Sequence, residues 1–200
     1  MGIRRNPYIL YTLSLPFILA VRYSWRGIFL WALYNVLFLI AVPFALALFL
    51  GFRPTELGFK LGNGRGYRWA LVLLIATIPL SLYGTTVPSM KDYYPIFSFS
   101  SPLDFAIKEL AMGAIMLANE AFYRGVLLMP LAEKNRWPAI LAQDVPYTLA
   151  HIGKPGIEIP YAFVAGIVFS WLDLESESFL PSFLLHWLGS AFFDVLCAFM

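Results

Sequence analysis

Residues 27 to 50 contain no charged side chain and include Trp31, Phe38, Phe44 and Phe49. About 20 consecutive apolar residues are enough for an α-helix to cross the hydrocarbon core of a bilayer. Inside that core the backbone polar groups must be satisfied within the protein, because no water is available there. This run therefore predicts a membrane-spanning helix, and it limits the rest of the chain to folds that a bilayer permits.

The composition extends this prediction to the whole chain. Of its 200 residues, 60% are hydrophobic and 13% are charged, whereas a soluble domain is usually about 45–50% apolar. The net charge of +2 comes from 14 basic and 12 acidic side chains, which is too small and too scattered a charge to indicate a nucleic-acid partner. We therefore predict an all-α polytopic membrane protein that has the lipid bilayer around it. The sequence does not indicate an oligomeric state.

Hydropathy divides the chain into about seven candidate transmembrane helices, with six to eight as the range. A Gly-rich, charged surface loop is expected at 51–66 and a polar stretch at 88–101. The first span is short and is broken by Pro16, whereas the span from 102 to 133 is longer than the bilayer core is thick. We expect this long span to tilt, to kink near Gly113 or Gly125, or to project into water. The expected spans are residues 7–22, 27–50, 67–87, 102–133, 138–152, 158–174 and 179–200.

The basic residues predict the orientation of these spans. Cytoplasmic loops carry an excess of Lys and Arg, and a cytoplasmic N-terminus leaves eight basic residues inside and four outside. The inside residues would be Arg4, Arg5, Arg53, Lys60, Arg65, Arg68, Lys134 and Arg136, and the outside residues Arg22, Arg26, Lys91 and Lys154. We expect the N-terminus to be cytoplasmic.

Ionisable residues are rare in the first half of the apolar chain but recur in the second. Glu120 and Arg124 are four residues apart inside the span from 102 to 133, so a helix places them on one face. A charge within the bilayer is costly unless it is paired or lines a wet cavity, which makes each one a candidate functional residue. A salt bridge that only fixes helix packing is the alternative interpretation of this pair.

Both histidines of the chain lie in later candidate helices. His151 ends the segment Gln143-Asp-Val-Pro-Tyr147-Thr-Leu-Ala-His151, and His186, Ser190 and Asp194 form a polar stripe of every fourth residue on the last span. A polar stripe on an apolar helix faces protein or water and not lipid. Together with Glu120, the two histidines predict a polar cavity within the membrane. Its chemistry is either water activation by carboxylate and imidazole or a His/His/Glu metal site.

These residues resemble the motifs of the CPBP (Abi) family of intramembrane proteases, which includes CAAX prenyl endopeptidases and bacteriocin-processing proteins. The family motifs are EExxxR, FxxxH and HxxxN or HxxxD, each on a different helix. Here they correspond to Asn119-Glu120-Ala-Phe-Tyr-Arg124, to Tyr147-Thr-Leu-Ala-His151 and to His186-Trp-Leu-Gly-Ser190. The order and the spacing of the motifs agree with the family over about residues 105 to 195. The resemblance implies a scaffold of transmembrane helices at 1–100 and a catalytic core at 101–200.

Three positions depart from the motifs. Asn119 replaces the first glutamate, Tyr147 replaces the phenylalanine, and Ser190 replaces the last amide or acid. The first glutamate is the one usually assigned to water activation in family members that have both, and an asparagine side chain cannot act as a base. We interpret the chain as a single-glutamate variant of the family, in which Asp194 supplies a polar group near Ser190.

The resemblance implies a metal-independent glutamate protease, with no cofactor, in a prokaryotic cytoplasmic membrane. Glu120, His151 and His186 are the expected catalytic residues, with Asn119, Arg124, Tyr147, Ser190 and Asp194 in support. The expected substrate is a membrane-anchored protein or peptide, such as a CAAX-type tail, a leader peptide or a C-terminal sorting tail. The alternatives are a catalytically inactive scaffold or immunity-type protein that binds a peptide, and a metalloenzyme or a transporter.

Overall fold

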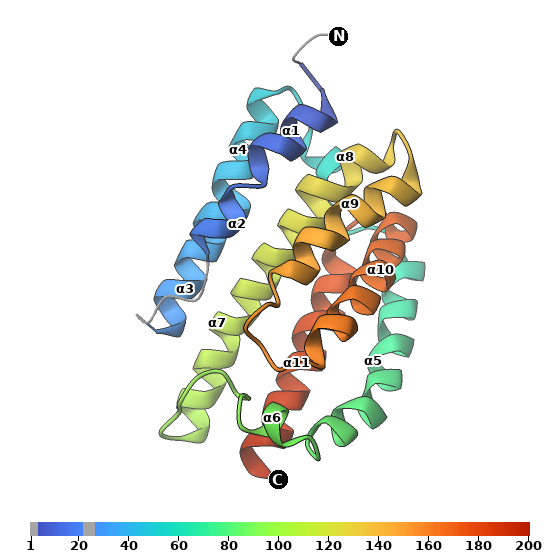
Figure 1. Ribbon diagram of the computed structural model, residues 1–200. Helices are drawn as coiled ribbons and strands as arrows, with labels where there is room; N and C mark the ends of the chain where they lie inside the picture. Colours follow the sequence, from blue (N-terminus) through green and yellow to red (C-terminus); the bar gives the residue numbers. More distant parts are fainter. Residues whose placement is uncertain (1–3, 22–26) are drawn as a thin grey trace.

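The computed structural model describes residues 4–21 and 27–200, and within these ranges every regular element is a helix. This confirms the all-α class. Figure 1 shows the elements, and most of them run roughly along one long direction of the molecule. The first part of the chain forms α1 (Pro7–Ser14), α2 (Phe17–Ala20), α3 (Ile28–Asn35), η1 (Val36–Ala41), α4 (Val42–Phe49), η2 (Pro54–Leu57), α5 (Gly64–Gly84) and α6 (Pro88–Lys91). The second part forms α7 (Pro102–Glu120), η3 (Ala121–Leu128), α8 (Met129–Ala132), α9 (Arg136–Leu149), α10 (Glu158–Ser176) and α11 (Leu180–Phe199).

Three of the described helices are long and apolar enough to cross a membrane. They are Ile28–Phe49, which runs through α3, η1 and α4, then α5 at Gly64–Gly84 and α11 at Leu180–Phe199. Each lies within three residues of a span that the hydropathy predicts. About 20 apolar residues match the thickness of the hydrocarbon core, so these helices indicate an integral membrane protein.

The other expected spans are also helical, with local differences. The first is divided into α1 and α2 at the predicted break, and the Asn6 side chain caps α1 by accepting hydrogen bonds from the backbone of Tyr8 and Ile9. Arg22 and Arg26, and with them the end of the first expected span, lie outside the described residues. Helix α9 ends at Leu149, so His151 lies in the turn that follows it.

The long span is one continuous helix from Pro102 to Ala132 whose middle changes type. Ser101 caps its start by accepting a hydrogen bond from the backbone N–H of Asp104. The π-helix η3 replaces α-helix over Ala121–Leu128, directly after Glu120, and includes Gly125. A Cβ atom at Gly125 would lie 2.7 Å from the carbonyl oxygen of Leu57. The irregularity near Gly125 is therefore a wider helical turn against which the loop containing η2 packs closely.

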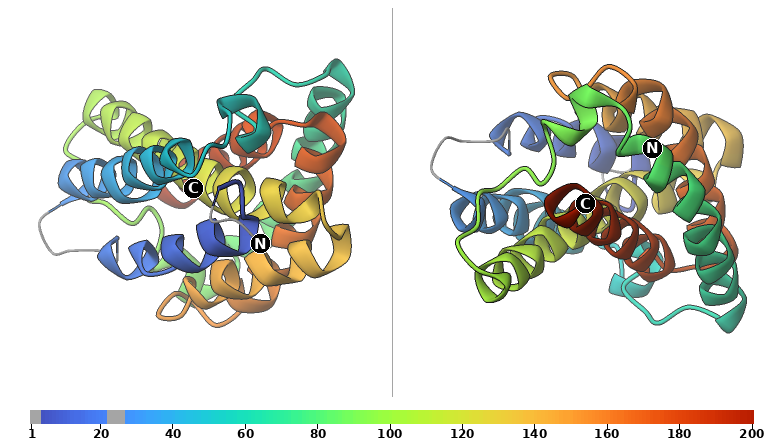
Figure 2. Two further views of the ribbon diagram at one scale, coloured as in Figure 1. Left: turned by 90° about the horizontal axis from the view of Figure 1, so that it is seen from above. Right: turned by 90° about the horizontal axis from the view of Figure 1, so that it is seen from below.

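This continuous helix lies in the middle of the molecule. Helix α3 packs on one side of α7 and α11 on the other, while α5 packs against α11 and α10. Figure 2, viewed from above, shows the N-terminal helices α1 to α4 on one side and α5, α10 and α11 on the opposite side. All eight residues of η3 are buried, and several join a hydrophobic cluster with residues of α1, η1 and α4. The centre of the fold therefore holds the residues that follow Glu120.

Candidate active site

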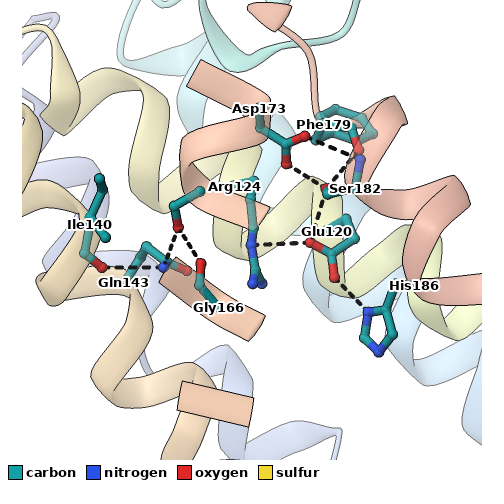
Figure 3. Close-up of polar contacts among 10 residues, drawn as sticks. Glu120, Arg124, Ile140, Gln143, Gly166, Asp173, Phe179, Ser182 and His186 are labelled. Carbon is teal, nitrogen blue, oxygen red and sulfur yellow. Dashed lines mark hydrogen bonds and ion pairs between the residues drawn. The ribbon is translucent and has the colours of Figure 1, made fainter. Parts of the chain in front are cut away.

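Glu120 is fully buried at the end of α7, and hydrogen-bond donors surround its carboxylate. Its Oε1 lies 2.7 Å from Nδ1 of His186 on α11, and its Oε2 lies 3.1 Å from Nε of Arg124. The Oγ atom of Ser182 lies 3.3 Å from the same Oε2. Figure 3 shows these contacts converging from α7, η3 and α11. Both carboxylate oxygens are therefore used as acceptors, which is how a buried carboxylate can remain charged.

Arg124 is also fully buried, so the predicted pair is a buried ion pair and not an exposed one. Its guanidinium carbon lies 4.1 Å from the centre of the Tyr147 ring and 5.4 Å from that of Phe169. Such cation–π contacts favour Arg and fix the plane of its side chain. Tyr147, which occupies the phenylalanine position of the motif, thus helps to position Arg124, which forms the ion pair with Glu120.

The two histidines line the same cavity, which has a volume of about 340 Å³. His151 lies on it with Nδ1 2.9 Å from the carbonyl oxygen of Tyr147, and His186 lies on it with its Nδ1 toward Glu120. Since a carbonyl and a carboxylate can only accept hydrogen bonds, each Nδ1 carries the hydrogen in this geometry. Each neutral ring then has Nε2 as an acceptor. Ser190, one turn after His186, lines the cavity as well.

Most of the cavity wall is apolar. It includes Leu80 of α5, Ile96, and Met112 and Met116 of α7. Glu120 is not among the lining residues found in the described part of the chain, but it contacts His186, which lines the cavity. An apolar cavity with a few converging polar groups is typical of a ligand site.

Two polar residues beside Glu120 were not singled out from the sequence. Asp173, near the end of α10, and Ser182, in the first turn of α11, are both fully buried. The backbone N–H of Ser182 donates to Oδ1 of Asp173 at 3.2 Å, and the Ser182 hydroxyl contacts Oδ2 closely. Asp173 is an acid inside an expected span, so the rule for ionisable residues in the membrane could have indicated it.

A second buried acid interacts electrostatically with Arg124. Asp144 of α9 is fully buried and packs against Gly166 of α10, where a Cβ atom would overlap with its Oδ1. Next to it, Gln143 donates a hydrogen bond to Ser170 at 2.7 Å, and Ser170 donates to the carbonyl oxygen of Gly166 at 2.7 Å. The lack of a side chain at Gly166 therefore makes room for the Asp144 side chain of α9.

Asn119 and Asp194 are not brought to this site. The Asn119 amide donates to the carbonyl oxygen of Ile115 at 2.7 Å and lies 3.5 Å from Oδ1 of Asn35 on α3. Asp194 is fully buried and does not line the cavity. Position 119, where the family motif has its first glutamate, thus faces the N-terminal helices. Asp194 does not add a polar group beside Ser190 to the described cavity wall.

A polar group also lies on the cavity wall away from Glu120. Tyr94, in the segment before α7, donates to Oε1 of Glu158 at 2.6 Å, and Nζ of Lys154 lies 3.3 Å from Oε2 of Glu158. Burial, together with the nearby Glu158 carboxylate, raises the pKa of Tyr94. The Tyr94 hydroxyl therefore keeps its hydrogen and ties the segment before α7 to α10.

A metal centre was one interpretation of the sequence pattern. Within residues 4–21 and 27–200, no three His, Cys, Asp or Glu side chains are grouped closely enough to hold a metal ion. Glu120 and His186 are in direct contact instead, and the Nδ1 atom of His186 is turned to the carboxylate. The arrangement is that of an imidazole oriented by a carboxylate.

A comparison with protein families identifies the same segment. Residues 105–192 match the family model described as type II CAAX prenyl endopeptidase Rce1-like. The match covers less than half of the chain, and over this segment the chain is similar to the CPBP family, to which the matched model belongs. The resemblance of the three motifs is thereby confirmed for α7 through most of α11, the part of the chain that carries Glu120, His151 and His186. No curated protein matches the chain, and no solved structure matches it.

The family indicates a class of activity for this segment. The matched model is described as a CAAX prenyl endopeptidase, so the similarity is to a family of peptide hydrolases. With the three apolar helices, the match also supports an integral membrane protein.

Proposed function

We propose that this chain is an intramembrane endopeptidase that hydrolyses a peptide bond of a membrane-associated substrate, without a metal or another cofactor. The observation that carries the proposal is the 2.7 Å contact between Glu120 and His186, beside a cavity that both histidines line. Carboxylate, imidazole and an accessible cavity are the minimum that water activation requires.

His186 is the group that takes the proton in this mechanism. Water in the cavity gives a proton to Nε2 of His186, and its oxygen bonds to the carbonyl carbon of the substrate. Glu120 holds the Nδ1–H tautomer and stabilises the imidazolium that forms, as the aspartate does in serine proteases. When the carbon–nitrogen bond breaks, the imidazolium returns the proton to the leaving amine. Glu120 thus acts through His186 and does not contact the water.

His151 and Ser190 complete the site from two other positions. Nε2 of neutral His151 accepts a hydrogen bond from the attacking water, since its Nδ1–H is used by the Tyr147 carbonyl. The Ser190 hydroxyl donates to the oxygen of the tetrahedral intermediate. One such donor typically contributes about 10²–10³ in rate, so serine in place of the family's asparagine or aspartate preserves a useful part of the chemistry.

The substrate we favour is a lipidated C-terminal peptide of the CAAX type. The name of the matched family describes this class, and the apolar cavity wall around Met112 and Met116 suits an apolar side chain or a lipid chain. Leader peptides and C-terminal sorting tails are the other candidates.

Cleavage of a farnesylated CAAX peptide by the protein in liposomes tests the proposal. We expect wild type to release the C-terminal tripeptide, and we expect Glu120→Gln, His151→Ala and His186→Ala to lose at least about 100-fold in rate, the scale of one lost catalytic group. Asp104→Asn is the matched control, because Asp104 lies at the exposed start of α7 and pairs with Lys108. Full activity in all three site variants would refute the mechanism.

Two other outcomes would identify the alternatives. Activity that a chelator removes and zinc restores would indicate a metalloenzyme. Stable retention of the peptide, with no cleaved product after long incubation, would indicate a binding protein that has lost catalysis.

A further inference from the structure

The Ser182 hydroxyl lies within reach of three acceptor oxygens. It closely contacts Oδ2 of Asp173, and it lies 3.3 Å from Oε2 of Glu120 and 3.0 Å from the carbonyl oxygen of Phe179. A hydroxyl has one hydrogen to donate and two lone pairs with which to accept. If both carboxyl groups are ionised, the closest contacts around this hydroxyl include at least one pair of oxygens with no hydrogen between them. A buried arrangement of that kind is costly.

The charges around the hydroxyl lead to the same difficulty. Three fully buried carboxyl groups, those of Glu120, Asp144 and Asp173, interact electrostatically with one fully buried arginine, Arg124. Each uncompensated ion in such a place costs several kcal/mol. Like charges that share a site do not both ionise readily. We therefore expect at least one of the three carboxyl groups to be protonated.

The hydrogen bonds distinguish Asp173 from Glu120. Glu120 accepts from the ring of His186 at Oε1, and its Oε2 forms an ion pair with Arg124 at 3.1 Å, so an added hydrogen would conflict with a donor or with the cation. Among the described residues, Asp173 receives hydrogen bonds only from Ser182, whose backbone N–H donates to Oδ1. Its Oδ2 is free to carry a hydrogen toward the Ser182 oxygen.

We propose that Asp173 is a neutral carboxylic acid that donates to Ser182, which in turn donates to Glu120. In this chain of hydrogen bonds the Ser182 hydrogen is shared between Glu120 and the Phe179 carbonyl, and the close contact with Asp173 becomes a normal acid–hydroxyl hydrogen bond. Asp173 and Ser182 are then positioning residues. They connect α10 and α11 to the carboxylate of α7 and hold it in the orientation that His186 needs.

The inference rests on the proposed function only for its effect on catalysis, so its first test does not use activity. Infrared spectra of the purified full chain are compared for wild type and Asp173→Asn. We expect wild type to have a protonated carboxyl C=O band, sensitive to deuteration, that the variant lacks. Asp104→Asn, at the partly buried ion pair with Lys108 away from this site, is the control and should leave that band unchanged. If the spectrum of Asp173→Asn instead lacks ionised carboxylate bands that wild type has, and wild type has no acid band, the proposal is wrong.

Ser182→Ala provides a second spectroscopic test. It removes the acceptor of the Asp173 hydrogen but not the acid itself, so we expect the acid band to shift in frequency and to persist. A spectrum in which the Asp173 band is identical with and without the Ser182 hydroxyl would contradict the hydrogen bond.

Rescue by the conservative variant separates positioning from charge. Asparagine can donate to Ser182 through its amide nitrogen and accept from the Ser182 backbone through its oxygen, so it mimics a neutral acid but not a carboxylate. We expect Asp173→Asn to retain the cleavage rate within about threefold and Asp173→Ala to lose at least about tenfold, with the loss in kcat and not in KM. Equal losses in the two variants would refute the neutral form. If wild type cleaves nothing but the acid band is present, the proposed function fails while this inference stands.

Discussion

Replacing Arg124 by methionine removes the cation from a buried ion pair and keeps a long apolar side chain in its place. Arg124 and Glu120 are both fully buried, with Nε and Oε2 at 3.1 Å, and the guanidinium also lies over the Tyr147 ring. Breaking a buried pair by removing one partner costs about 3–5 kcal/mol, because the remaining charge is uncompensated. For a domain of this size each kcal/mol lowers the melting temperature by about 2–4 °C. We therefore expect a decrease of about 6–20 °C.

The measurement is thermal unfolding of the detergent-purified protein, with all variants heated at one scan rate. Adding Glu120→Gln to Arg124→Met removes the uncompensated charge, so the double variant should be more stable than the sum of the two single losses predicts. A double-mutant cycle should give a coupling free energy of about 1–3 kcal/mol. Two single losses that simply add in the double variant would refute the interpretation of this pair as an interacting buried ion pair.

Three further substitutions test other parts of the structure. Gly166→Ala should destabilise the protein by about 1–3 kcal/mol through overpacking against Asp144, and adding Asp144→Ala should recover part of the lost melting temperature. An unchanged melting temperature in the single variant would contradict this contact. Asn119→Ala should keep kcat within about threefold of wild type, because the Asn119 amide contacts α3 and not the cavity. A loss of kcat as large as that of Glu120→Gln would show a catalytic role for Asn119. Tyr94→Phe should lower the unfolding free energy by about 1.5–3 kcal/mol, the contribution of a hydrogen bond to a charged group. An unchanged melting temperature would show that the hydrogen bond to Glu158 of α10 does not contribute to stability.

The parts of the fold that the bilayer itself determines could be predicted from the sequence. The spans at 27–50, 67–87 and 179–200 agree with helices of suitable length and apolarity, because a hydrophobic run of that size has few other stable structures in a membrane. Glu120, Arg124 and His186 could be singled out for the same reason, since an ionisable group in such a run must find partners. The structure brings Arg124 and His186 each into direct contact with Glu120.

Contacts that depend on helix rotation and on packing between helices could not be predicted in this way. His186, Ser190 and Asp194 form one stripe in the sequence, but at 3.6 residues per turn Asp194 lies about 80° around the helix from His186. Asp194 therefore leaves the cavity that Ser190 lines. The pairing of Asp173 with Ser182 depends on how α10 and α11 meet, which no local spacing rule describes.

The orientation of Asn119 limits what a glutamate at this position could do. Its amide is tied to its own helix and to Asn35, and it faces the N-terminal helices. A single change of Asn119 to glutamate would put an acid against an amide and a backbone carbonyl at the α3 interface, and not into the cavity. A second acid facing the cavity from position 119 would need the end of α7 to turn as well. One substitution therefore does not convert this site into a two-glutamate site.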